Sequence, residues 1–371
     1  DRPAPLVELG RALFFDPELS GNRDVSCATC HHPAEASGDG LLVSVGTGGI
    51  GTGSERRPGE GRRLIARNAT EIYNRGAAEW VTMFWDGRVS IGRDGTLATP
   101  AGDELPGGTD GVLAAQAMFP VTSRDEMRGS EEDAAAGNEL AAIDDDEFPE
   151  IWDALMQRLA EIPEYRDLFA AAFPDAPDGA WRFEQAAEAI AAFEAEAFTF
   201  TQSPWDRYLR GDDGALGEAE KRGALLFFGD AGCGSCHMGP LLTDQGYHNM
   251  AVPQVGPGRE GDAPRDFGRA RASGRSEDRY SFRTPPLRNV TLTGPWMHDG
   301  AYDDLEAAVR HHLDPARALT AYDPARLPPE VAAAHDVPLE RLHEQILAFL
   351  PDRPPMLLDD AQIADLLTFL S

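Results

Sequence analysis

The sequence contains two copies of one short pattern, CATCH at residues 27–31 and CGSCH at residues 233–237. C-x-x-C-H is the attachment signature of c-type haem, in which both cysteines bond to the porphyrin edge and the histidine becomes the proximal ligand of the iron. A zinc site would need four ligands grouped together, and a redox dithiol needs no histidine. The two motifs use all four cysteines of the chain, so no structural disulfide is expected. The predicted haem-binding residues are Cys27, Cys30 and His31, and Cys233, Cys236 and His237.

The net charge and the lack of long apolar runs limit the partners and the compartment expected for this chain. Its 371 residues carry a formal net charge of -30 at pH 7. A surface this acidic repels nucleic acid and anionic membranes and favours basic partners. No apolar run approaches the ~20 residues that cross a bilayer. Because haem is attached to C-x-x-C-H outside the bacterial cytoplasm, we expect a periplasmic protein whose leader has been removed.

The apolar spacing predicts a mainly α fold with little strand. Helical patterns cover residues 6–15, 151–173, 181–200, 304–313, 338–350 and 359–369. A block at 221–228 precedes the second motif much as 6–15 precedes the first, which indicates an internal repeat. We therefore expect two cytochrome c-like haem domains, 1–203 and 204–371, that meet near Ser203-Pro204.

Three segments rich in Gly, Pro or polar residues are predicted to be long loops, namely 35–63, 92–111 and 254–281. The first of them is expected to lie over the first haem. The strongly acidic stretch 129–147 is predicted to be a solvated surface segment.

The positions of the histidines predict that the two haem irons differ. No histidine lies between His32 and His237, and His32 adjoins the proximal ligand, so it cannot easily reach the opposite face. An iron with a vacant sixth site can bind peroxide, whereas one with two protein ligands mainly transfers electrons. The first haem is thus expected to be open, with ligation by a methionine as the alternative. The methionines in question are Met83, Met118, Met127 and Met156. The candidates to close the second haem are Met297, His298, His311 and His312.

Several stretches besides the haem motifs resemble the bacterial di-haem cytochrome c peroxidase family, which includes the MauG-like enzymes. The most specific are FWDGR at 84–88, QAMFPVTSRDEM at 116–127 and TGPWMHDG at 293–300. The resemblance implies two cytochrome c-like domains, a peroxidatic N-terminal haem, a C-terminal haem that relays electrons, and a calcium ion between the domains.

The resemblance also assigns roles to single residues. Gln116 and Glu126 match a family pair beside the open haem face, where a base moves a proton and an amide orients peroxide. Trp85 matches a tryptophan between the haems, although Trp80 lies close to it in sequence. The segment 92–111 is an insertion relative to the family's usual spacing, so its role near the first haem is open.

The remaining assignments concern metals. Asn74, Thr293 and Pro295 match the family's calcium ligands, and the last two would otherwise form a simple turn. At the second haem the family places its sixth ligand fourteen residues after the His of HDG, which is His312 here. His311 is the next candidate for this ligand, and Met297 follows it.

The expected function is therefore reduction of hydrogen peroxide at the N-terminal haem, with electrons relayed through the C-terminal haem. One alternative is a MauG-like enzyme that uses peroxide to oxidise residues of a partner protein. A second is a di-haem electron carrier without catalysis. Expected partners are peroxide and a small redox protein, cytochrome c or cupredoxin, or a protein substrate. The resemblance also allows a homodimer.

Overall fold

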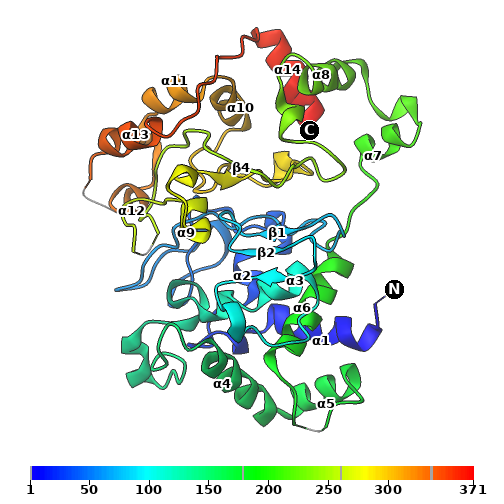
Figure 1. Cartoon of the computed structure of the whole chain (residues 1–371), viewed down its shortest axis with the longest axis vertical. Coiled ribbons are helices and arrows are strands. Elements are labelled where there is room, and N and C mark those ends of the chain that lie inside the picture. The colour runs from blue at the N-terminus through cyan, green and yellow to red at the C-terminus, as the bar shows by residue number, and fades with distance from the viewer. Residues whose placement is uncertain (1, 178, 260, 335–336) are drawn as a thin grey trace.

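The structure, a computed structural model, describes residues 2–177, 179–259, 261–334 and 337–371. It confirms the mainly α class. Figure 1 shows a lower lobe built from the N-terminal half of the chain and an upper lobe built from the C-terminal half. The largest core cluster draws its buried residues from 9–198 and Leu241, whereas three smaller clusters draw theirs from 227–366 and Val43. The domain boundary at residue 203 stays a prediction.

The described helices and strands are short and are separated by long connections. The α-helices are α1 (Ala4–Phe15), α2 (Cys27–Cys30), α3 (Gly111–Ala117), α4 (Phe148–Glu161), α5 (Pro163–Ala172), α6 (Phe183–Ala197), α7 (Pro204–Leu209), α8 (Glu218–Phe228), α9 (Arg269–Ser273), α10 (Leu305–Leu313), α11 (Pro315–Thr320), α12 (Pro329–Ala332), α13 (Leu339–Leu347) and α14 (Asp360–Leu370). The strands are β1 (Thr82–Met83), β2 (Val89–Ile91), β3 (Leu97–Ala98), β4 (Tyr247–His248) and β5 (Phe282–Arg283). Antiparallel pairing joins β1, β2 and β3 in one sheet and β4 and β5 in another.

Each lobe is organised by one crossing of two helices at a glycine. In the lower lobe α1 packs on α6, and a Cβ added at Gly10 would lie 1.8 Å from the carbonyl oxygen of Ala189. In the upper lobe α8 packs on α14, and a Cβ at Gly223 would lie 2.1 Å from the carbonyl oxygen of Asp365. Only glycine permits such close backbone approach. The two crossings follow the internal repeat and place each haem motif just after its first helix.

Replacing Gly10 should therefore weaken the lower lobe. We expect Gly10→Ala to cost about 1–3 kcal/mol, because the new methyl group overpacks the crossing of α1 and α6. Urea unfolding followed by circular dichroism measures the change. Gly107→Ala is the matched control, since a Cβ there meets nothing within 4 Å. Equal unfolding midpoints for the two variants would contradict this role of the crossing.

The structure corrects four details of the sequence-based predictions. The predicted loop 92–111 contains β3 after a tight hairpin turn that begins at Gly92. The single helix predicted over 151–173 is α4 and α5, because proline at 163 interrupts the helical hydrogen bonds. The loop 254–281 includes α9. In the acidic segment 129–147, Asp133 is buried rather than solvated and binds Arg62 through two hydrogen bonds of 2.6 and 2.5 Å.

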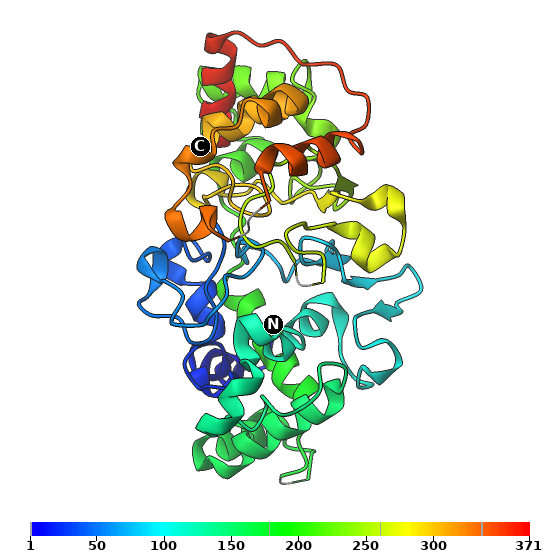
Figure 2. The ribbon, with the colours of Figure 1, turned by 90° about the vertical axis from the view of Figure 1, so that its left-hand side faces the viewer.

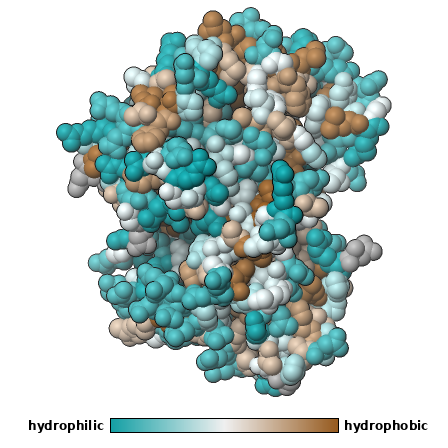
Figure 3. Space-filling view, viewed as in Figure 1, coloured by the Kyte–Doolittle hydropathy of each residue, from teal (hydrophilic) through white to brown (hydrophobic). Residues whose placement is uncertain are grey.

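The lobes are joined by loops of both halves. Val43 and the partly buried Leu64, from the loop that follows the first haem motif, pack in a cluster with Val255 and Tyr302 of the upper lobe. In Figure 2 the segment containing α9 lies beside the sheet of β1 and β2. The outline in Figure 3 narrows where the lobes meet, and hydrophilic residues cover most of the visible face.

Candidate functional site

The first haem motif forms one wall of a large cavity in the lower lobe. This cavity has a volume of about 1110 Å³, and Cys27, Cys30 and His31 all line it. The short helix α2 carries the two cysteines, and His31 ends it. The Nδ1 atom of His31 lies 3.2 Å from the carbonyl oxygen of Ser37, an atom that can only accept, so Nδ1 carries the proton and Nε2 is free to bind iron. Both sulfurs and the free nitrogen thus suit a covalent haem.

The second motif lines a smaller cavity of about 190 Å³ in the upper lobe. His237 repeats the arrangement of the first proximal histidine, because its Nδ1 lies 3.1 Å from the carbonyl oxygen of Leu242. Cys233 and Cys236 line the same cavity. This donor set again fits a c-type haem held through two sulfurs and one imidazole.

Across the second cavity the imidazole of His312 faces that of His237. Their ring centres lie 6.5 Å apart, which leaves space for one metal ion between two imidazole nitrogens bonded at about 2 Å each. The Nδ1 of His312 donates to the carbonyl oxygen of Ala308 at 2.8 Å, so its Nε2 is free. His311 differs: its Nε2 donates to the Met250 carbonyl and its Nδ1 accepts from a tyrosine hydroxyl, each at 2.7 Å. His311 therefore has no nitrogen left for a metal.

Met297 and His298 lie elsewhere on the wall of the second cavity. Met297 packs partly against the cluster around Val255. His298 is buried and stacked on Phe282 with ring centres 3.5 Å apart. In the first cavity, His31 is the one histidine among the described lining residues, and Met83 and Met127 are its methionines. His335 lies outside the described residues.

Gln116 and Glu126 both line the first cavity. Gln116 belongs to α3, and Glu126 lies in a π-helical turn, Arg124–Arg128, a rare element that often marks functional sites. Burial raises the pKa of the Glu126 carboxyl above its ordinary value, and the guanidinium groups of Arg88, Arg259 and Arg67 offset part of that rise. A buried carboxyl group in this position can accept a proton from a bound molecule and return it.

Trp85 and Trp80 lie in different surroundings. Trp85 lines both cavities, and its Nε1 donates to the carbonyl oxygen of Asn68 at 3.0 Å. Trp80 is absent from the described lining of both cavities, and the guanidinium groups of Arg75 and Arg283 lie 4.2 and 5.2 Å from its ring centre. Two nearby positive charges oppose removal of an electron from the Trp80 ring. Of the two, Trp85 has the position for electron transfer between the cavities.

A buried charge cluster beside Trp85 was not predicted from the sequence. Arg67 binds Asp266 through two hydrogen bonds of 2.6 and 2.8 Å and lies 2.9 Å from Asp86. Arg88 and Arg259 also pair with Asp86. Burial raises the pKa of the Asp86 carboxyl, but the three arginines outweigh it and hold that pKa well below the usual range. Burial also raises the pKa of the Asp266 carboxyl, but Arg67 outweighs it and lowers that pKa to about 2, so both carboxyl groups are ionised. The cluster joins residues from both halves of the chain.

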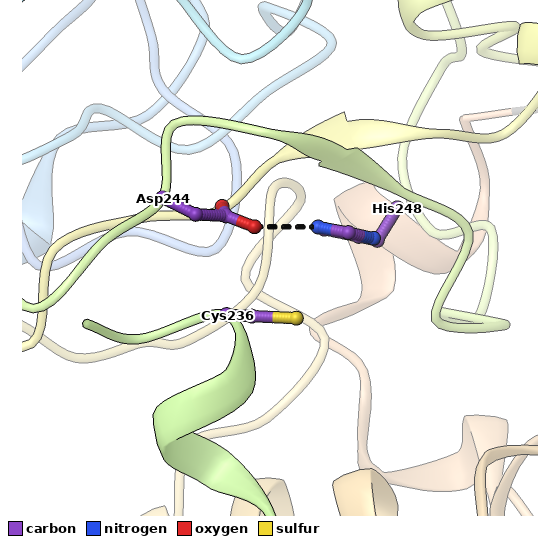
Figure 4. Close-up of side chains that lie close together, drawn as sticks. All are labelled: Cys236, Asp244 and His248. Atoms are coloured by element: carbon purple, nitrogen blue, oxygen red, sulfur yellow. Dashed lines mark hydrogen bonds and ion pairs between the residues drawn. The ribbon is translucent and has the colours of Figure 1, made fainter.

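Figure 4 shows a second cluster, at the edge of the second cavity, formed by Cys236, Asp244 and His248. The Nε2 of His248 lies 3.1 Å from Oδ2 of Asp244. Three such side chains can hold a metal ion, but the second motif commits the Cys236 sulfur to a thioether bond. A thioether lacks the negative charge of a thiolate. We therefore assign the cluster to the surroundings of the second haem rather than to another metal.

The predicted calcium ligands are only partly brought together. Thr293 and Pro295 line the second cavity. Asn74 is buried, and its Oδ1 accepts a hydrogen bond of 2.7 Å from the backbone N–H of Phe200. An amide oxygen has a second lone pair, and backbone carbonyls supply the neutral oxygens that Ca²⁺ accepts alongside water. The residues are thus compatible with calcium, although they supply no carboxylate.

Comparison with known proteins decides the family. A sequence profile described as di-haem cytochrome c peroxidase matches residues 4–214. The chain belongs to the di-haem cytochrome c peroxidase family. The methylamine utilisation protein MauG of Methylorubrum extorquens is 33% identical over 83% of this chain and 68% of its own length. The cytochrome c551 peroxidase of Pseudomonas aeruginosa is 34% identical over 81% of this chain and 70% of its own length.

A solved structure extends the likeness to the whole chain. A MauG-like protein associated with microbial copper homeostasis has a TM-score of 0.65 and 26% identity, over 100% of this chain and 89% of that one. The family and the activity class are thereby confirmed: the chain is an oxidoreductase of the cytochrome c peroxidase family, which acts on peroxide. Its two C-x-x-C-H motifs are consistent with two c-type haems.

Proposed function

We propose that this protein reduces hydrogen peroxide in the first cavity with electrons that arrive through the second. One observation carries the proposal: Trp85 forms part of the wall of both cavities, one with Glu126 and Gln116 and the other with the facing pair His237 and His312. An open site with a proton-exchanging group is thus joined to a closed site suited to electron transfer.

The side chains of the first cavity have separable tasks. The haem, when bound through Cys27, Cys30 and His31, supplies the iron centre at which peroxide is reduced. Glu126 accepts a proton from one peroxide oxygen and returns it to the other, so that the O–O bond breaks with water as the leaving group. The amide of Gln116 orients the peroxide. Overall, one peroxide, two electrons and two protons give two water molecules.

In the second cavity His237 and His312 would hold the haem iron and supply a site suited to electron transfer. A backbone carbonyl fixes the imidazole of each histidine, so neither ring needs to reorient when an electron passes. A pair of histidines favours ferric iron relative to histidine with methionine.

Electron transfer between the cavities should depend on Trp85. We expect Trp85→Phe to slow the electron transfer that follows peroxide addition by on the order of 100-fold, while peroxide still reacts at the first haem. Stopped-flow spectra of the half-reduced protein measure this rate. Trp80→Phe is the control, because Trp80 lies beside two arginines and outside the described lining of both cavities. Equal slowing by both substitutions would exclude a specific relay through Trp85.

Steady-state turnover tests the proposed function. The di-haem protein is mixed with peroxide and a reduced small cytochrome c or cupredoxin, and two donor molecules should be oxidised per peroxide. One observation keeps the MauG-like alternative open, the nearly equal identity to MauG and to cytochrome c551 peroxidase. It predicts slow donor oxidation and a long-lived oxidised protein. Membership of a peroxidase family counts against the non-catalytic carrier.

The partners and the compartment follow from charge and haem chemistry. Within the described residues, no helix is both long and apolar enough to cross a membrane. We infer a periplasmic location, since C-x-x-C-H motifs acquire haem outside the cytoplasm. The net charge of -30 favours a donor with a basic docking face, and a homodimer stays a proposal. Periplasmic fractionation and gel filtration test these two points.

We further propose one structural Ca²⁺ held by Asn74 with the carbonyl oxygens of Thr293 and Pro295. Removing the Asn74 amide should release the ion, because no other side chain of this trio supplies oxygen to it. We expect Asn74→Ala to lower the calcium content from one ion per chain towards none, as measured by elemental analysis, whereas Asn74→Asp keeps it. Calcium that persists in the alanine variant would place the ion elsewhere.

A further inference from the structure

The first cavity is positively charged in an otherwise acidic protein. Its described lining includes eight arginines and four acidic residues, although acidic residues outnumber basic ones 63 to 33 in the chain. The arginines are Arg57, Arg62, Arg63, Arg67, Arg75, Arg88, Arg259 and Arg283. All but two precede residue 90. Arg259 is one of the two exceptions, because the loop 254–281 of the C-terminal half brings it to this cavity.

The backbone of this loop holds Arg259 in place. Its N–H donates to the carbonyl oxygen of Arg265 at 2.9 Å, and its own carbonyl accepts from the N–H of Asp262 at 2.9 Å. The guanidinium group pairs with Asp86, the residue that follows Trp85. Its side chain is 29% exposed, and Asp86 is fully buried. Arg259 therefore reaches from the upper lobe into the wall of the peroxide cavity.

The buried cluster around Asp86 holds three arginines and two carboxylates. Arg67 is matched by Asp266 through two hydrogen bonds, which leaves Arg88 and Arg259 to share the single carboxylate of Asp86. One positive charge is thus unmatched within the cluster, and the carboxyl group of Glu126 lines the same cavity as Arg88 and Arg259, whose charges favour its ionised form. The charged groups with the largest effect on Glu126 are Arg88, Arg259, Arg67 and Asp125, and among these four Asp125 alone disfavours its ionised form.

We propose that Arg259 is a positioning residue contributed by the C-terminal half, which keeps Glu126 ready to accept a proton by holding Asp86 and adding positive charge to the first cavity. Docking of the two halves then completes the acid–base site as well as the path for electrons. This inference rests on the proposed function, since it assigns a partner to the acid–base group of that reaction.

The sign of the expected effect follows from electrostatics. Burial raises the pKa of Glu126, and a nearby guanidinium group lowers it by stabilising the carboxylate. Loss of Arg259 should therefore raise this pKa. The rate of the peroxide reaction falls at low pH as Glu126 becomes protonated, and this acid limb of the pH–rate profile should move to higher pH by roughly 0.5–1 unit. At a pH below the limb, the rate should fall about 3- to 10-fold.

The experiment measures the pH profile of the second-order reaction of peroxide with the di-haem protein. Arg259→Gln should show the shifted limb, and Arg259→Lys, which keeps the charge, should restore most of the original profile. Arg265→Gln is the control on the same loop, because its side chain bonds to Gln345 and not to the cluster. If Gln at position 259 does not give folded di-haem protein, Arg259→His, uncharged above about pH 7, takes its place.

A second readout is the infrared carbonyl band of protonated Glu126, identified by its absence in Glu126→Gln. The pH at which this band is half lost should rise in Arg259→Gln, by the same amount as the acid limb of the pH–rate profile. An unchanged midpoint and limb in a protein that reacts with peroxide would overturn the role of Arg259. A shifted haem spectrum with an unchanged Glu126 band would also overturn it, since Arg259 would then serve a haem propionate. Failure of the unsubstituted protein to react with peroxide would instead refute the proposed function.

Discussion

Glu126→Gln should lower the second-order rate constant for the reaction with peroxide by about 10²- to 10⁴-fold, the usual contribution of a positioned general base. Glutamine keeps the size and polarity of the side chain but cannot accept the proton. Because Glu126 lies in the π-helical turn Arg124–Arg128, whose backbone bonds do not involve its carboxyl group, the fold should be retained. Stopped-flow absorbance of the haem band measures the rate.

The control for this variant lies a few residues away. The side chain of Glu131 is 83% exposed, so Glu131→Gln should react as the unsubstituted protein does. Full peroxide reactivity in Glu126→Gln would remove the catalytic assignment.

His312→Met should raise the reduction potential of the second haem by on the order of 100 mV, within the roughly 0.8 V range that axial ligands span. A thioether stabilises ferrous iron relative to a second imidazole. The first haem should keep its potential, because the described lining of its cavity includes neither His312 nor any residue of α10. A spectroelectrochemical titration resolves the two haems.

His311→Gln is the matched control on the same helix. Its imidazole bonds to Tyr302 and Met250, so we expect a loss of stability of about 1–3 kcal/mol without a change in either haem potential. A shifted potential in the His311 variant, together with an unchanged one in His312→Met, would reverse the ligand assignment.

The sequence pattern alone predicts those parts of the molecule that depend on residues close together in the chain. The helices around Gly10 and Gly223 follow from apolar spacing, and each haem motif is complete within five residues. The strands β1 and β3 have two residues each, too few for an alternating pattern to be recognised. The break between α4 and α5 was marked by proline at 163, a signal that the surrounding apolar spacing concealed.

The remaining parts depend on contacts between distant residues. His311 and His312 are adjacent on α10, and their different roles become visible only through the partners of each ring nitrogen. Arg67 and Asp266 are 199 positions apart in the sequence, and no spacing pattern predicts that they pair. The acid–base pair Gln116 and Glu126 came from family resemblance, whereas the arginines around Glu126 needed the structure.

The two haem irons are predicted to be unequal, one open beside Glu126 and one closed between His237 and His312. Electron paramagnetic resonance of the resting ferric protein tests it most directly. We predict one high-spin signal from the first haem and one low-spin signal from the second, with the high-spin signal alone lost when peroxide is added. Two low-spin signals that peroxide leaves unchanged would contradict the claim.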